Sequence, residues 1–131
     1  MTTIMKGKEV AIALKEKIKA GVTELKEKGK VTTCGFIRVG DRSDSIGYEN
    51  AAIKVLSSLG IECVQFHYPE DITEANFISE LEKIGNDDSV DGFLLLRPLP
   101  AHIDDDLVGM KIKPKKDIDG VSPYNIGEVF Y

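Results

Sequence analysis

The chain has 131 residues, of which 42% are hydrophobic and 30% charged, and its formal net charge is −5 at pH 7. This size supports a single hydrophobic core, and this composition is typical of a folded globular domain. The net negative charge indicates no basic surface for nucleic acid, and no apolar run is long enough to span a membrane. We therefore expect a cytoplasmic domain that binds neither nucleic acid nor a membrane.

The first half of the chain alternates between helical and strand-like patterns. Apolar residues at helical spacing from Gly7 to about Lys28 predict an amphipathic helix that ends at Gly29. Residues 31–39 predict a strand. A loop and helix cap at 41–45 leads into a second predicted helix, Ser45 to Ser58.

The second half continues the alternation. Ile61 to His67 predicts a strand, Thr73 to Ile84 a helix, and Val90 to Leu96 a wholly apolar strand that should be buried on both faces. Asp104 to Met110 predicts a short helix, and Asp117 to Val121 a short strand or turn. We therefore expect a three-layer α/β/α domain with a mainly parallel sheet and right-handed crossovers.

The cysteines and histidines do not form a metal-binding pattern. Cys34 and Cys63 lie in apolar strand-like runs, where small buried thiols are expected in place of a disulfide. His67 and His102 have no second ligand at metal spacing and are expected at the surface. The acidic run 104–106 is expected to start a helix. We expect no metal site.

Tyr48 is the first candidate ligand-binding residue. The pattern puts it in the first turn of the second helix, at the carboxyl end of the first strand, where doubly wound folds bind ligands. Its ring could stack on a ligand, or it could pack with its hydroxyl in water. Ala52 lies ~40° round the helix from Tyr48, whereas Lys54 lies ~120° away. General acid–base chemistry from this helix is therefore not expected.

Two further segments follow strand ends. Arg97 precedes the rigid loop Pro98-Leu99-Pro100, whose carbonyl groups could bind a ligand's amino groups. The Arg97 side chain points either into the cleft or to solvent. Asp119 could accept two hydrogen bonds from an amidine-like edge such as the aminopyrimidine of a pterin, or it could stabilise its own turn. Together these segments predict a small-molecule cleft.

Five motifs occur in order along the chain. They are Val39-Gly40-Asp41 with Ser45 and Tyr48, Lys54 with Gly60, Asp91-Gly92 leading into Pro98-Leu99-Pro100, residues 116–120 (Lys-Asp-Ile-Asp-Gly), and residues 123–127 (Pro-Tyr-Asn-Ile-Gly). The chain, 1–131, thereby resembles the amino-terminal, folate-binding catalytic domain of the methylenetetrahydrofolate dehydrogenase/methenyltetrahydrofolate cyclohydrolase family. The resemblance implies that Tyr48 stacks on the folate, that Asp119 binds the pterin, and that Pro98, Leu99 and Pro100 form the cleft wall.

The chain departs from the family pattern at three positions. The family's catalytic lysine falls on Ala52, the glutamine that supports it falls on Leu96, and the first leucine of the following loop falls on Arg97. The resemblance implies a folate pocket whose cyclohydrolase activity is weak or lost. Hydride transfer between folate and nicotinamide needs positioning more than a protein acid, so dehydrogenase chemistry is compatible with this loss. The roles of Arg97 and Lys54 stay open.

Relatives in this family continue into a Rossmann-type domain, and this chain contains no Gly-x-Gly-x-x-Gly fingerprint. We expect a part of a longer protein in which NAD or NADP is bound outside residues 1–131, with no cofactor bound by this chain alone; a naturally short folate binder is the alternative. The resemblance further implies a tetrahydrofolate derivative of one-carbon metabolism as ligand, and a homodimer. A non-catalytic folate-binding or regulatory paralogue, or a generic α/β domain, would explain the same motifs.

Overall fold

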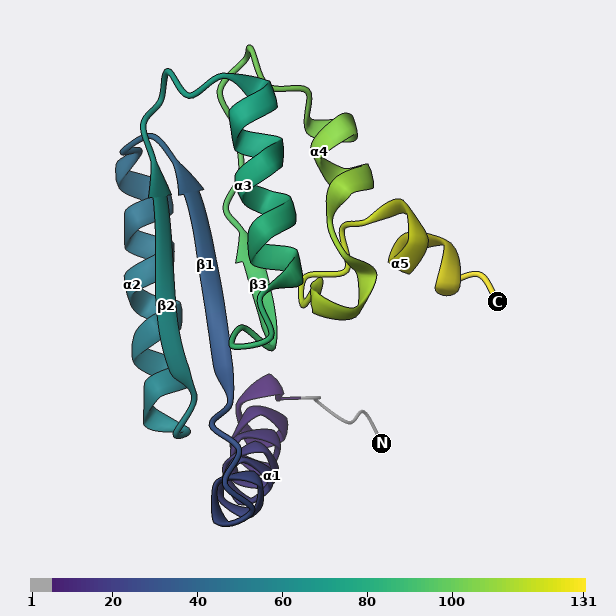
Figure 1. Cartoon of the computed structure of the whole chain (residues 1–131). Helices are drawn as coiled ribbons and strands as arrows, with labels where there is room; N and C mark the ends of the chain where they lie inside the picture. Colours follow the sequence, from purple (N-terminus) through teal and green to yellow (C-terminus); the bar gives the residue numbers. More distant parts are fainter. Residues whose placement is uncertain (1–5) are drawn as a thin grey trace, which may run out of the picture.

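The computed structural model describes residues 6–131. The elements follow the order α1 (Gly7–Glu27), β1 (Thr33–Val39), α2 (Ser43–Ser58), β2 (Glu62–Tyr68), α3 (Glu74–Asn86), β3 (Gly92–Leu95), α4 (Asp105–Lys111), the 3-10 helix η1 (Pro114–Lys116) and α5 (Pro123–Glu128). The three strands form one parallel sheet in the order β2-β1-β3 (Figure 1). This confirms the predicted α/β class and the parallel sheet.

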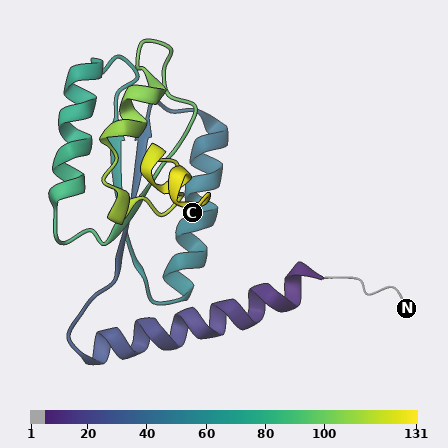
Figure 2. The ribbon, with the colours of Figure 1, turned by 90° about the vertical axis from the view of Figure 1, so that its right-hand side faces the viewer.

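Helices cover both faces of the sheet, as predicted. Figure 2 shows α2 on one side of the strands and α3 on the other. Alternate residues of β1 point to opposite faces, so Ile37 and Val39 join the buried cluster with Phe77 and Leu81 of α3. Phe36 and Arg38 point to the α2 face, where both are buried. The α2 face therefore contains a charged group in an otherwise apolar layer.

The first residues of α2 and α3 test the helix starts that we predicted from the sequence. The predicted start of α3 at Thr73 is confirmed, and Thr73 Oγ1 caps the helix by accepting a hydrogen bond from the Asn76 amide at 3.3 Å. Helix α2 instead begins at Ser43, two residues earlier than predicted, after an Arg42 whose side chain makes no cap hydrogen bond. The prediction that Tyr48 lies in the first turn is therefore wrong: it lies in the second.

The carboxyl-terminal part contains two short elements that the sequence did not predict, η1 and α5. Phe93 of β3 forms an isolated parallel bridge with Asp117, and a turn through Gly120, whose φ is +70°, follows it. This segment passes close to β3, because a Cβ on Gly92 would lie 2.5 Å from Cγ2 of Ile118. The predicted strand or turn at 117–121 is thus a single bridge followed by a turn.

Helix α1 is confirmed as an amphipathic helix, but most of its apolar side is exposed. Val22 is its one buried residue, whereas Val10 is 69% and Leu14 is 54% exposed. Both ribbon views show α1 beyond the amino ends of the strands, running away from the sheet (Figures 1 and 2). Within residues 6–131, no helix combines the length and the apolar character that crossing a membrane requires.

Candidate functional site

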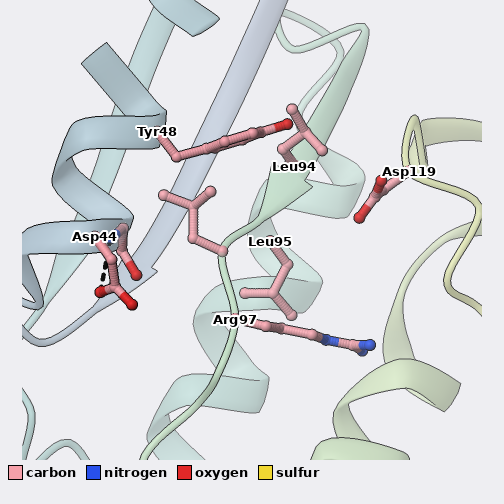
Figure 3. A pocket seen from close by; sticks show the side chains of 8 residues that line it. Asp44, Tyr48, Leu94, Leu95, Arg97 and Asp119 are labelled. Carbon is pink, nitrogen blue, oxygen red and sulfur yellow. Dashed lines mark hydrogen bonds between the residues drawn. The ribbon is translucent and has the colours of Figure 1, made fainter. Parts of the chain in front are cut away.

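A cavity of about 340 Å³ lies beside the carboxyl end of β3 (Figure 3). Its lining comes from α2, from the end of β3 and from the turn after η1: Asp44, Ser45, Tyr48, Leu94, Leu95, Leu96, Arg97 and Asp119. This volume is in the range of small-molecule sites, and the carboxyl ends of parallel strands are where doubly wound folds bind ligands. The structure thus brings Tyr48, Arg97 and Asp119, far apart in the sequence, around one cavity.

Tyr48 offers an open aromatic surface to this cavity. The residue is 57% exposed, and its ring extends from α2 toward the side on which Asp119 lies (Figure 3). Its neighbours Ser45 and Glu49 are buried and hold the inner side of the same helix against the sheet. The ring is therefore free to stack on a flat ligand, while the helix that carries it is anchored.

The anchor is a buried charge cluster that sequence reasoning missed. Arg38 Nε lies 3.3 Å from Oε2 of Glu49, which is 1% exposed, and His67 Nε2 lies 2.8 Å from Glu49 Oε1. Arg38 also donates to the carbonyl of Gly40 and, at 2.7 Å, to Asp41. Hydrogen bonding to Asp41 raises the pKa of Arg38 against the opposing effect of burial. The cluster joins α2 to both β1 and β2, and its member Glu49 follows Tyr48 directly in the sequence.

Two sequence signals could have revealed this cluster. Arg38 is the single charged residue of an otherwise apolar strand, and Glu49 lies four residues after Ser45 on the side of the helix that faces the sheet. A buried carboxylate is stable only with partners, which makes such a pairing physically necessary. His67 is exposed, as expected of a surface histidine, and it also takes part in the pairing.

Asp117 organises the turn that presents Asp119. Its carboxylate accepts hydrogen bonds from the amides of Gly120 at 3.0 Å and Ser122 at 2.8 Å, and from Nδ2 of Asn125 at 2.9 Å. Burial raises the pKa of Asp117, but these hydrogen bonds outweigh it and the pKa is lowered. Residues 6–131 make no hydrogen bond to the Asp119 carboxylate, which is exposed and faces the cavity. The turn-stabilising role that we considered for Asp119 therefore belongs to Asp117.

Arg97 lines the cavity, but the loop that follows it does not. Its Nε lies 3.0 Å from Asp105 Oδ1, and its side chain is 33% exposed. Pro98, Leu99 and Pro100 instead border a separate cavity of about 220 Å³, together with Gly40 and Glu70 among others. The prediction that these three residues form the wall of a folate cleft stays a prediction. Beyond Arg97 the loop lies near the end of β1, since Val39 and Gly40 line the same cavity.

The positions that depart from the family pattern contain no proton-transfer group. Leu96 lines the cavity and is buried, while neither Ala52 nor the exposed Lys54 contributes to the lining. Asp44 lines the outer edge, where hydrogen bonds from Arg42 and from the Ser45 amide lower its pKa. Arg97 is the one cationic side chain of the lining, and an arginine does not release its proton near neutral pH. The arrangement suits binding and positioning of a ring with polar edges.

The cysteines lie on the α2 face of the sheet, next to each other in register on β1 and β2. Cys34 is buried, as predicted, and burial together with Cys63 raises its pKa to about 11, while Cys63 is partly buried and both are free thiols. Among the described residues, no three His, Cys, Asp or Glu side chains converge in a way that could hold a metal ion.

The parallel sheet and the cavity at its carboxyl edge define an α/β ligand-binding domain of the doubly wound type. The sequence profile of the tetrahydrofolate dehydrogenase/cyclohydrolase catalytic domain matches residues 5–119. The chain therefore belongs to the tetrahydrofolate dehydrogenase/cyclohydrolase family, which confirms the resemblance seen in the five motifs.

Individual relatives agree with this assignment. The bifunctional protein FolD of Clostridium kluyveri is 38% identical over 129 residues, which are 98% of this chain and 45% of the relative. The crystal structure of the bifunctional FolD methylenetetrahydrofolate dehydrogenase/cyclohydrolase from Campylobacter jejuni matches with a TM-score of 0.91 and 35% identity, over 97% of this chain and 45% of that one.

A third match is the FolD enzyme of Trypanosoma brucei, solved in complex with NADP and an inhibitor. Its TM-score is 0.87 at 27% identity, over 98% of this chain and 44% of that chain. The chain thus spans about half the length of the relatives that it matches.

Proposed function

We propose that this chain is the folate-binding catalytic domain of a 5,10-methylenetetrahydrofolate dehydrogenase-like enzyme of one-carbon metabolism, with weak or absent cyclohydrolase activity. The observation that carries the proposal is that Tyr48 and Asp119 line one cavity in a chain of this family. We propose a tetrahydrofolate derivative as the ligand of this cavity.

The chemistry of the lining supports a reduced pterin. The exposed Tyr48 ring can stack on a flat heterocycle, an interaction worth about 0.5–1.5 kcal/mol beyond buried area. The Asp119 carboxylate can accept two hydrogen bonds from the 2-amino and N3–H groups of the pyrimidine edge. Leu94, Leu95 and Leu96 give the cavity an apolar floor for the rest of the ring.

The same lining supports the loss of cyclohydrolase activity. Hydrolysis of a methenyl bridge needs a group that moves a proton between water and the folate nitrogens. The family resemblance implies that this group is a lysine held by a glutamine, and the matching positions here are Ala52 and Leu96. Since both partners are replaced together, neither is left as an unpaired buried polar group.

The proposed dehydrogenase reaction moves a hydride directly between the folate and a nicotinamide ring, so the domain's part in it is to bind and orient the folate. We propose NAD or NADP as cofactor of the longer protein, bound outside residues 1–131. The Trypanosoma brucei relative, which was solved with NADP, supports this choice. The proposed homodimer rests on the family resemblance, and the proposed cytoplasmic location rests on the composition and apolar pattern of the sequence.

A non-catalytic folate-binding or regulatory paralogue is the second candidate. Arg97 favours it, because a guanidinium in the cavity can hold a ligand in place without offering a proton for turnover. Under this reading the pocket binds folate, but the longer protein has neither dehydrogenase nor cyclohydrolase activity.

Calorimetric titration of this chain with tetrahydrofolate and with a stable 5,10-bridged analogue tests the proposal. Binding should be lost or weakened at least tenfold in Asp119→Ala, because the ligand's donor edge loses its acceptor. Asp88→Ala is the matched control, since Asp88 is exposed and lies outside the cavity lining. If the folded chain binds neither compound, the proposed folate site is wrong. Hydride transfer by the longer protein then separates the dehydrogenase from the non-catalytic paralogue.

A further inference from the structure

Arg97 lines the Tyr48 cavity, and the proposed dehydrogenase-type function gives it no role. It borders the Tyr48 cavity and also a neighbouring cavity of about 280 Å³ between α4 and α5, so its side chain separates the two. Its Nη2 atom lies 3.8 Å from where a Cβ on Gly109 would be, so the guanidinium lies beside α4. Arg97 therefore forms part of the wall of both cavities.

The guanidinium keeps donors available for a ligand. Its Nε faces Asp105 at 3.0 Å, which restricts the orientation of the planar group. Nη1 and Nη2 together carry four N–H groups, and in residues 6–131 neither atom donates a hydrogen bond to the protein. The half-exposed contact with Asp105 contributes little stability, so its main effect is on orientation.

Asp119 and Arg97 have opposite charges and lie around the same cavity, yet no ion pair joins them in the described part of the chain. In Figure 3 the Arg97 side chain extends toward the side of the cavity on which Asp119 lies. One wall therefore offers an acceptor and a separate donor. A ligand satisfies both when it presents donor groups and, next to them, an acceptor.

A 2-amino-4-oxo-pteridine ring has this arrangement. Its 2-amino and N3–H groups are neighbouring donors, and the 4-oxo group beside N3 is an acceptor. We propose that Arg97 binds the 4-oxo group while Asp119 binds the donor edge, so that Arg97 selects 4-oxo over 4-amino pteridines. This proposal rests on the proposed folate site. It concerns a residue that stands where relatives have leucine.

The selection follows from hydrogen-bond chemistry. A guanidinium donating to a carbonyl oxygen forms a charge-assisted hydrogen bond, which is stronger than a neutral one. A 4-amino group offers its own N–H groups to the guanidinium, which cannot accept them, so one donor is left unpaired. The 4-amino compound also has no N3–H, so it keeps only its 2-amino contact with Asp119. That loss is the same in the wild type and in the Arg97 variants, so the effect of Arg97 is measured by comparing the ratio of the two affinities between variants.

The experiment titrates tetrahydrofolate and its 4-amino-4-deoxy counterpart into this chain and into Arg97→Leu. The measured quantity is the dissociation constant of the 4-amino compound divided by that of the 4-oxo compound. We expect this ratio to fall about tenfold or more in Arg97→Leu. Lys83→Leu removes an exposed positive charge on α3, outside the cavity, and should leave the ratio unchanged.

The outcomes separate this proposal from the one it rests on. If both proteins bind tetrahydrofolate and the ratio is the same in both, Arg97 does not bind the 4-oxo group and the folate site stands. If the folded wild-type chain binds neither compound, the folate site itself is wrong and this inference is wrong with it. Arg97→Gln, which keeps one amide donor, should give an intermediate ratio and provides the test if the leucine variant does not fold.

Discussion

The buried pair Arg38–Glu49 gives the sharpest test of how the candidate site is supported. In Glu49→Gln the shape of the side chain is kept and the charge is removed. Glu49 is 1% exposed and is paired with both Arg38 and His67. The change leaves Arg38 buried without its partner on α2, although Arg38 keeps its contacts with Asp41 and with the carbonyl of Gly40.

The size of the effect follows from these contacts. Removing one partner of a buried ion pair costs about 3–5 kcal/mol, and the contacts that Arg38 retains favour the lower end, about 3 kcal/mol. For a domain of this size, that loss corresponds to a fall in melting temperature of about 10 °C. Since Glu49 adjoins Tyr48 on α2, folate affinity should fall as well, even though Glu49 is not part of the cavity lining.

Urea unfolding measures the loss through a double-mutant cycle with Arg38→Met. The cycle consists of Arg38→Met, Glu49→Leu and the variant that carries both. The double variant should cost clearly less than the sum of Arg38→Met and Glu49→Leu, because it leaves no uncompensated buried charge in the pair. Glu24→Gln is the matched control, since Glu24 pairs with Lys28 on the exposed surface of α1 and the change should have little effect. A loss below about 1 kcal/mol in Glu49→Gln, or strictly additive changes, would refute the reasoning.

Three more predictions concern the turn, the aromatic surface and the missing catalytic pair. Asp117→Asn should lower the free energy of unfolding by about 2 kcal/mol near neutral pH. The pKa of Asp117 is lower in the folded than in the unfolded chain. The stability difference between wild type and variant should therefore be complete above pH ~4, the pKa of Asp in the unfolded chain, and should disappear as the pH falls through the folded-state pKa. A stability difference that does not change with pH would contradict the assigned hydrogen bonds. Tyr48→Ala should weaken folate binding about tenfold in calorimetry while Tyr48→Phe changes it little, and equal losses would argue against stacking. Ala52→Lys with Leu96→Gln should raise methenyltetrahydrofolate hydrolysis, followed by absorbance, whereas Leu96→Gln alone should only destabilise the chain by burying an unpaired amide; no gain in the double variant would contradict the pocket alignment.

Most of the sheet and the long helices could be predicted because their signals are local. The apolar run that contains β3 and the helical spacing of α3 are properties of consecutive residues. The predicted start of α3 at Thr73 is confirmed for the same reason, since the hydrogen bond that caps this helix joins residues three apart. Helix α5 was missed because it has only six residues, and its stability depends on a distant contact between Asn125 and the carbonyl of Pro114.

The sequence by itself determined the class of the fold, the family, and the presence of Tyr48, Arg97 and Asp119 at strand ends. Only the tertiary structure decided which of these share a cavity. It placed the loop 98–100 beside Gly40 and Glu70, gave the turn-stabilising role to Asp117, and paired Glu49 with Arg38 and His67. The physical reason is that a pattern along the chain fixes which face of its own element a side chain occupies, whereas its partners depend on how separate elements pack.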